Sequence, residues 1–157
     1  MAPIDDGTSA GARHDDEAPT RQWRLGAYAL CRREGEVLLV RASSRTEVEG
    51  RWFLPGGGVR FGEHPADAVV RELAEETGLM ATEVSLRDVD SDVRPRRSGT
   101  REFTVRLLFD AVVDTTAPLV SEEGGTSDEA RWVPLAELGS YPLVDYVARV
   151  LGAASAK

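Results

Sequence analysis

The chain has 157 residues and a formal net charge of −8. This length supports one domain, which can bury about 70% of the surface of its extended chain. The negative charge argues against nucleic acid or an anionic membrane as a partner, because neither attracts an acidic protein. Small phosphorylated ligands remain possible, since a bound cation reverses the local field. The single cysteine, Cys31, excludes an internal disulfide and indicates a reduced core residue in a cytoplasmic protein.

The first 20 residues are rich in Asp, Gly, Ala, Pro and Ser and show no apolar periodicity, which predicts a disordered tail. They lack the apolar segment of a signal peptide, and no later segment approaches the ~18 apolar residues that span a bilayer. No internal repeat or second domain is visible. Residues 21–157 are therefore expected to form a single domain.

Apolar runs in the first third of the chain predict three strands. Residues 24–31 and 36–40 are expected to form two strands joined by a tight turn at residues 33–35. A polar loop over residues 41–50 then leads into a short strand at residues 52–54.

Aromatic residues flank the glycine turn that follows, at residues 56–58. Trp52 and Phe61 bracket the turn, so one of them is a candidate to line a substrate cleft, whereas core packing is predicted for Phe53. Tyr28 is a second candidate for stacking on a base. The alternative for Tyr28 is core packing with its hydroxyl at the rim.

The second half of the chain contains two further strands, a basic loop and a terminal helix. Residues 82–89 show a weak strand pattern, and residues 102–114 show the clearest apolar alternation in the sequence. The loop at residues 91–101 is either a solvated hairpin tip or a clamp for a phosphorylated substrate, which arginine suits through its bidentate geometry. Its arginines are Arg94, Arg96, Arg97 and Arg101. An apolar stripe over residues 143–151 predicts a terminal helix that begins near Pro142.

A helix beginning at Pro65 is the most strongly marked element. Proline suits the first helical position, where no amide hydrogen is needed, and Gly78 suits the left-handed residue that closes a helix. At ~100° per residue, one stripe of this helix is expected to face the core. The stripe consists of Ala66, Val69, Val70, Leu73, Ala74 and Thr77.

Acidic side chains gather on a different stripe of the helix and in the loop before it. They are Glu63, Glu72, Glu75 and Glu76. One interpretation is a solvated acidic face, but each like-charged pair three or four residues apart costs a helix ~0.2–0.5 kcal/mol, and only Arg71 relieves it. The other interpretation is a site for a hard cation such as Mg²⁺, which takes oxygen ligands. The adjacent glycine turn favours the cation, because it lets a backbone or a ligand approach closely.

The spacing of these residues resembles a complete Nudix box. From Gly57 the chain reads Gly, five residues, Glu63, seven residues, then REL, one residue, EE, one residue and GL, ending at Leu79. The flanking segments GRWFLPGGG and DEARWVPLAEL also resemble the surroundings of the box in Nudix hydrolases. The resemblance covers about residues 24–151 and implies an α/β protein, an α/β/α sandwich with a mixed β-sheet.

The resemblance also implies roles for the box residues. Glu75 and Glu76 would bind Mg²⁺ most directly, with Mn²⁺ as a substitute. Glu72 would be a ligand or the general base, Glu63 an outer ligand or base, and Arg71 would orient a carboxylate.

Further site residues are expected outside the helix. Gly57 and Gly58 would let the backbone pass close to the substrate. Nudix enzymes commonly draw one more acidic ligand or base from a loop outside the box, here residues 114–129. Three candidates stay open in that loop: Glu122, Glu123 and Asp128.

The implied reaction is metal-dependent hydrolysis of the diphosphate linkage of a small nucleotide, a nucleoside diphosphate joined to another group. Pro95, sixteen residues beyond Leu79, resembles a feature of members that hydrolyse ADP-ribose. Arg94, Arg96 or Arg97 would then reach the distal phosphate or ribose. A nucleoside triphosphate is the competing substrate, and a nucleotide-sensing regulatory protein without turnover is an alternative of another class. Either a monomer or a homodimer is compatible with the sequence.

Overall fold

The computed structural model describes residues 18–119 and 123–152. Residues 1–17 of the predicted tail therefore lie outside the described residues. The order of elements is β1 (Arg21–Leu30), β2 (Arg32–Arg33), β3 (Glu36–Ala42), β4 (Trp52–Phe53), β5 (Gly56–Gly58), α1 (Pro65–Thr77), β6 (Ala81–Pro95), β7 (Arg101–Val113), β8 (Ser127–Pro134), a 3₁₀ helix η1 (Leu135–Ser140) and α2 (Asp145–Leu151).

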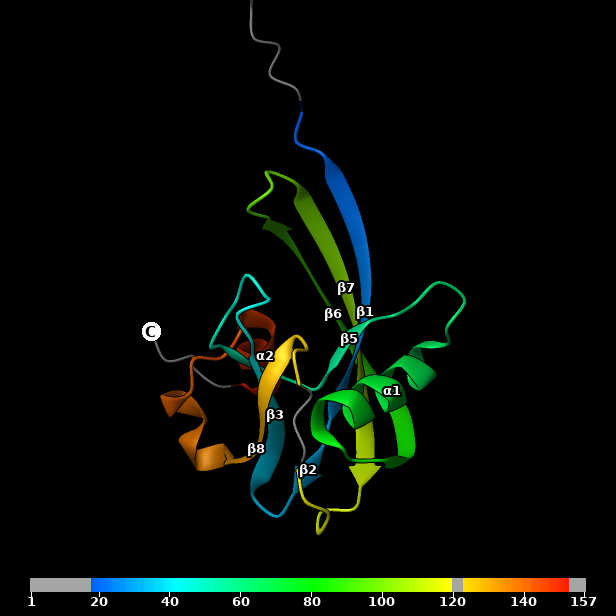
Figure 1. Cartoon of the computed structure of the whole chain (residues 1–157), viewed down its shortest axis with the longest axis vertical. Helices are drawn as coiled ribbons and strands as arrows, with labels where there is room; N and C mark the ends of the chain where they lie inside the picture. The colour runs from blue at the N-terminus through cyan, green and yellow to red at the C-terminus, as the bar shows by residue number, and fades with distance from the viewer. Residues whose placement is uncertain (1–17, 120–122, 153–157) are drawn as a thin grey trace, which may run out of the picture.

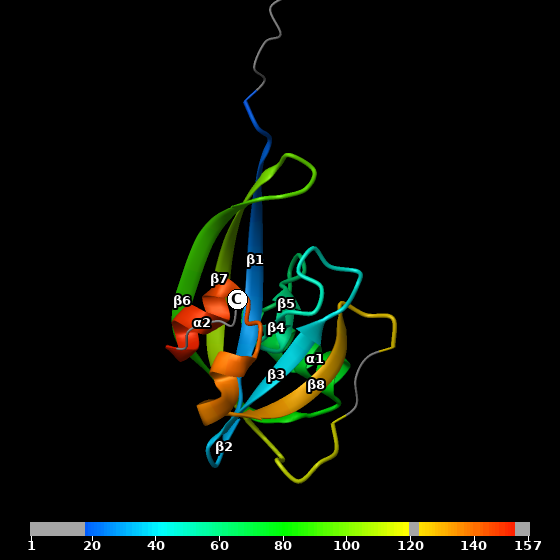
Figure 2. The same cartoon turned by 90° about the vertical axis from the view of Figure 1, so that its left-hand side faces the viewer.

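Two four-stranded sheets form the centre of the fold. The first has the order β5-β1-β7-β6, with β1 parallel to β7 and the other pairs antiparallel. In the second, β3 pairs with β2 near its start and with β4 near its end along one edge, and with β8 along the other edge. The strands β1, β6 and β7 extend well beyond the second sheet (Figure 2).

The helices α1 and α2 lie on opposite sides of the sheets (Figure 1). One core cluster joins α2 to both sheets through residues such as Leu30, Leu39 and Val147. The other joins α1 to both sheets through residues such as Ala29, Leu38 and Leu73. This arrangement confirms the predicted α/β/α sandwich with mixed strand directions. None of the helices in the described part is long and apolar enough to cross a membrane.

Several predicted boundaries differ from those observed. The strand predicted at residues 24–31 begins three residues earlier, at Arg21, because its exposed first half pairs in register with β7. It does not form a hairpin with β3, since the turn joins β3 to the short β2 instead. The terminal helix begins at Asp145 rather than near Pro142. Cys31 is buried and free, as predicted, and burial raises the pKa of its thiol to about 12.

The largest correction concerns β6, which continues to Pro95. The predicted loop at residues 91–101 is reduced to the turn at residues 96–100, because Arg94 pairs with Glu102 and Pro95 with Arg101 in the ladder with β7. Arg94 and Arg101 therefore project from strands, while Arg96 and Arg97 lie in the turn.

The strand predicted at residues 102–114 is confirmed as β7. Over its first half, however, the polar side chains are buried and the apolar ones are not. Glu102, Thr104 and Arg106 are buried, whereas Phe103 and Val105 between them are only half-buried. The polar face of this strand is the covered one.

Candidate active site

The helix α1 begins at Pro65 and is closed by Gly78, as predicted, and the structure adds a side-chain cap. His64 is the N-cap, and its Nδ1 accepts a hydrogen bond from the backbone N–H of Ala66 at 3.2 Å. Pro65 follows at the first helical position. Gly78 has a φ of 73°, the left-handed conformation that a glycine adopts without strain. The residues at its two ends therefore determine where α1 begins and ends, and so where its acidic side chains lie.

The guanidinium of Arg71 lies among three of the predicted carboxylates. Its Nε and Nη2 donate to Glu63 at 2.8 and 3.0 Å, and its Nη1 donates to Glu72 at 2.8 Å and to Glu75 at 3.3 Å. Nη2 also donates to the carbonyl of Gly58 at 3.2 Å. Arg71 therefore fastens the helix to the loop before it and to β5, which fits the predicted role of orienting a carboxylate.

These contacts shift the ionisation of both partners. The hydrogen bonds from Arg71, and then that from the backbone N–H of Arg60, hold the pKa of Glu63 at about 2. In return, the hydrogen bond to Glu63 raises the pKa of Arg71, against the opposing effect of burial. Glu63 is consequently a carboxylate throughout the neutral range, and a weak base.

Glu76 is placed differently from the other carboxylates. Its side chain is 1% exposed, and the backbone N–H of Gly56 donates to its Oε2 at 2.8 Å. The structure also buries Ala68, Val69, Leu73 and Thr77 on this helix, whereas Ala66, Val70 and Ala74 of the predicted apolar stripe are only partly buried, so the covered face is rotated towards Glu76. Glu76 thus lies between α1 and β5 rather than on the solvated side.

The glycines of β5 are needed for close packing of two kinds. A Cβ on Gly56 would lie 2.3 Å from the carbonyl oxygen of Ala27, a backbone clash, and its φ of 150° already disfavours a side chain. A Cβ on Gly57 would lie 2.7 Å from Oε1 of Glu72. Gly56 is therefore required by the sheet, whereas Gly57 makes room for a box carboxylate.

A cavity of about 520 Å³ opens from these glycines along the first sheet. Six of the predicted site residues line it: Tyr28, Gly57, Gly58, Glu72, Arg94 and Arg96. The volume is within the range of small-molecule sites. The cavity therefore brings one end of the acidic box together with arginines from β6 and the following turn.

Other candidate residues lie elsewhere. Trp52 is 6% exposed in the core, with its ring centroid 5.4 Å from that of Tyr141, and Phe53 lines the cavity in its place. Phe61 is fully exposed. Arg97 is exposed in the turn.

Two of the three candidates for an additional acid, Glu123 and Asp128, are not brought to the cavity. Asp128 pairs with Arg41 at 2.7 Å on the second sheet. Glu123 is exposed, and neither it nor Asp128 is among the residues that line the cavity. Glu122 lies outside the described residues.

The floor of the cavity contains residues that the sequence analysis did not select. Glu102, Thr104 and Arg106 project from β7, and Arg24 from the neighbouring strand β1. The available signal was the polar half of the alternation over residues 102–114, but polar strand faces are usually exposed, so the pattern alone does not indicate a site.

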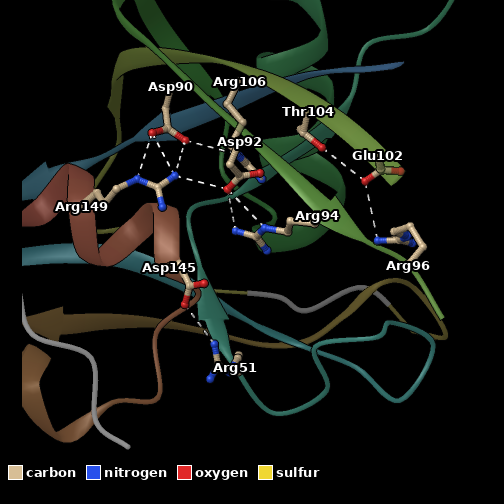
Figure 3. Close-up of polar contacts among 10 residues, drawn as sticks. All are labelled: Arg51, Asp90, Asp92, Arg94, Arg96, Glu102, Thr104, Arg106, Asp145 and Arg149. Atoms are coloured by element: carbon tan, nitrogen blue, oxygen red, sulfur yellow. Dashed lines mark hydrogen bonds and ion pairs between the residues drawn. The ribbon is translucent and has the colours of Figure 1, made fainter. Parts of the chain in front are cut away.

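An ion-pair network holds Arg106 in this floor (Figure 3). Its guanidinium donates to Asp90 at 3.1 Å and to Asp92 at 3.2 Å, and it lies 4.6 Å above the ring of Tyr146. Arg149 of α2 also binds Asp90, at 2.9 Å. Burial alone would raise the pKa of Asp92, but hydrogen bonds from Arg106 and Arg94 outweigh it and keep this pKa below its usual value.

The donor set of the box fits a hard divalent cation, because the side chains of Glu63, Glu72, Glu75 and Glu76 offer only carboxylate oxygens. Gly57 leaves the space beside Glu72 that a larger residue would fill. In the described ranges no three acidic, His or Cys side chains form a ready-made metal site. Arg71 lies among three of these carboxylates, so a cation would compete with its guanidinium for them.

The sequence matches the NUDIX domain family over residues 20–151, which is most of the chain. The chain belongs to the Nudix hydrolase family. It is 33% identical over 124 residues to the nucleoside triphosphatase NudI of Escherichia fergusonii, a match that covers 75% of this chain and 80% of NudI. Membership and relatives together identify the chain as a Nudix-type pyrophosphohydrolase.

Solved structures agree with this assignment. A MutT Nudix hydrolase from Burkholderia pseudomallei superposes with a TM-score of 0.72 at 27% identity, covering 85% of this chain and 99% of that one. The NUDIX domain of Shewanella oneidensis NrtR, solved with ADP ribose, superposes with a TM-score of 0.66 at 20% identity, covering 90% and 91% of the two chains. The second likeness concerns the fold alone.

Proposed function

We propose that this Nudix hydrolase requires Mg²⁺ and cleaves nucleoside triphosphates to a nucleoside monophosphate and pyrophosphate. The observation that carries the proposal is the arrangement of the cavity. One end is formed by Glu72 and the glycines of β5, and Arg24, Arg94 and Arg106 line the rest of the cavity. A cation at the acidic end and arginines beyond it are what a polyphosphate chain requires.

Each box residue has a role in this proposal. Glu72, Glu75 and Glu76 would hold Mg²⁺, with Glu63 as an outer ligand, and Mn²⁺ would substitute. The bound ion would neutralise the phosphate oxygens and lower the pKa of an attacking water. Arg71 positions Glu63 and Glu72 through its hydrogen bonds. Glu72 lines the cavity, so it is the candidate to take a proton from the water.

The choice of a triphosphate over ADP-ribose rests on two observations. The relative that shares 33% identity is a nucleoside triphosphatase, and Pro95, which favours ADP-ribose, is exposed and does not line the cavity. ADP-ribose is the second candidate, because Arg94 and Arg96 do line the cavity and could bind its distal phosphate or ribose. A regulatory protein without turnover would be expected to lose box carboxylates, and none is missing from this sequence.

A product assay tests the proposal. The purified full chain is incubated with nucleoside triphosphates, ADP-ribose and dinucleoside polyphosphates, with Mg²⁺ or with excess EDTA, and the products are separated by chromatography. We expect monophosphate and pyrophosphate from triphosphates, and no products in EDTA. Cleavage of ADP-ribose alone would refute the proposed substrate, and turnover in EDTA would refute the metal requirement.

The variant Glu76→Gln tests whether Glu76 belongs to the metal site. The amide keeps an oxygen that can accept from Gly56 but removes a metal-binding charge, so turnover should fall by at least about 100-fold. Glu83→Gln, an exposed change on β6 outside the cavity, is the control and should keep wild-type turnover. Similar turnover in both variants would exclude Glu76 from the metal site.

A further inference from the structure

The far end of the cavity contains a buried carboxylate, that of Glu102. Along β7 it lies four residues before Arg106, which is in register with Gly26 of β1 and, through Gly26, with Gly58 of β5. At about 3.3 Å per residue, this separates Glu102 from the glycine end of the cavity by about 13 Å along the strand. Glu102 is thus remote from the acidic box yet part of the same cavity.

The protein satisfies this carboxylate only in part. Glu102 is 7% exposed, and within residues 18–119 and 123–152 it accepts one hydrogen bond, from the hydroxyl of Thr104 at 3.2 Å. The Nη1 of Arg96 is 3.7 Å from the same oxygen, an ion pair without a hydrogen bond (Figure 3). A carboxylate has about four positions that accept hydrogen bonds, and buried ones are usually filled. Glu102 therefore has acceptor capacity left for a ligand in the cavity.

The complementary group is planar and carries two adjacent hydrogen-bond donors, because a carboxylate binds such a pair in a bidentate manner. Among the common nucleobases, only guanine has two adjacent donors on its pairing edge, the ring N1–H and the 2-amino group. Its O6 lies beside them and accepts. Arg96, next to Glu102, supplies a donor for that oxygen.

We propose that Glu102 selects guanine nucleotides, accepting hydrogen bonds from the ring N1–H and the 2-amino group while Arg96 donates to O6. The proposal rests on the proposed function, since it names the base of the nucleotide whose phosphates lie at the acidic box. Phe53, half-buried in the same cavity, provides an aromatic surface for the base. Glu102 determines specificity and takes no part in the bond cleavage.

The kinetic test compares kcat/KM for GTP, ITP, ATP, CTP and UTP in the wild type, Glu102→Gln and the control Glu83→Gln. ITP differs from GTP only by the missing 2-amino group. We expect the wild type and the control to prefer GTP over ITP by about 10-fold or more, and Glu102→Gln to lower kcat/KM for GTP by about 10- to 100-fold. The GTP/ITP ratio in Glu102→Gln should approach one, with UTP changed by less than about threefold. An equal loss for all five nucleotides would assign Glu102 a purely structural role and overturn the proposal.

A binding measurement tests the selection of guanine independently of hydrolysis. Calorimetric titration with GMP, IMP and UMP requires no turnover, so it remains decisive if no triphosphate is cleaved. GMP should bind more tightly than IMP and UMP to the wild type, and this advantage should disappear in Glu102→Gln. Equal affinities in the wild type would overturn the proposal even if triphosphate hydrolysis is observed. Thermal unfolding of both variants verifies that they are folded.

Discussion

In the half of the first sheet that contains the start of β7, the polar face is covered and the apolar face is exposed, the opposite of what most half-buried sheets show. On the inner face, Glu102, Thr104 and Arg106 are buried and line the cavity, and Tyr146 of α2 lies against Arg106. On the outer face, Trp23 is 76% exposed and Val89 53% exposed, and both belong to strands that also contribute to the inner face. The cover provided by other elements, rather than the polarity of the strand, decides which face is buried.

The inner face tolerates burial because its charges are paired. Arg106 is 4% exposed, but it lies between two aspartates and above an aromatic ring. An isolated charge at such a position would be strongly unfavourable, whereas a paired and hydrogen-bonded one is accepted. Three substitutions on the first sheet test this difference, and one at the acidic box gives a comparison, in decreasing order of expected effect.

Replacing Arg106 should have the largest effect on stability. Arg106→Met leaves Asp90 and Asp92 partly buried without their central partner, and we expect a loss of about 3 kcal/mol in the free energy of unfolding measured with urea. Arg87→Met, which removes an exposed pair with Asp110, is the matched control and should cost less than about 1 kcal/mol. Similar losses in both variants would mean that the inner network is no more important than a surface pair.

The same variant has a defined pH dependence. The pKa of Asp92 is lowered in the folded protein, so its contribution to stability is present above its usual pKa of 3.8 and is lost as the pH falls below it. Arg106→Met removes a cause of that lowering. The difference in stability between wild type and Arg106→Met should therefore narrow as the pH falls below 3.8. A difference that is constant from pH 7 to pH 3 would contradict the ion-pair explanation.

Removing the hydroxyl of Thr104 should have an intermediate effect. Thr104→Val keeps the shape of the side chain but removes the donor to buried Glu102, which should cost about 1–2 kcal/mol in urea unfolding. If the stability of Thr104→Val equals that of the wild type, the hydroxyl of Thr104 does not stabilise the carboxylate.

At the acidic box, the pairing of Glu63 with Arg71 should have a smaller effect, because Arg71 keeps its pairs with Glu72 and Glu75 when Glu63 is replaced. The pKa of Glu63 is lowered from 4.5 to about 2, so the pair stabilises the fold above pH 4.5 and ceases to do so as the pH falls towards 2. Glu63→Gln should accordingly be less stable than the wild type at pH 6 and equally stable near pH 2. Acid titration followed by circular dichroism measures this difference in stability. If the difference widens in acid, the pKa of Glu63 is not lowered by folding.

The smallest effect is expected on the outer face. Val89→Thr introduces a hydroxyl where the side chain is already more than half exposed, so the free energy of unfolding should change by less than about 0.5 kcal/mol. This exchange is the reverse of Thr104→Val on the covered face. A loss above about 1 kcal/mol would indicate that the outer face is covered in solution.

The sequence by itself determined those features that depend on near neighbours. The ends of α1 follow from Pro65 and Gly78, whose backbone preferences act locally. The box, with Arg71 four residues before Glu75, likewise depends on the repeat of one helix. The family, the fold class and the position of the acidic cluster could therefore be predicted.

Tertiary structure alone decided which side chains are covered and which meet across the cavity. Glu76 is buried because β5 lies against α1 and supplies an N–H, a contact between segments twenty residues apart. Phe53 rather than Trp52 lines the cavity, since the pairing of β4 with β3 sets which side each residue faces. Arg94, Glu102 and Arg106 reach one cavity through the register of β6, β7 and β1. Pairing between distant strands has no local signature in the sequence, so these placements could not be predicted from it.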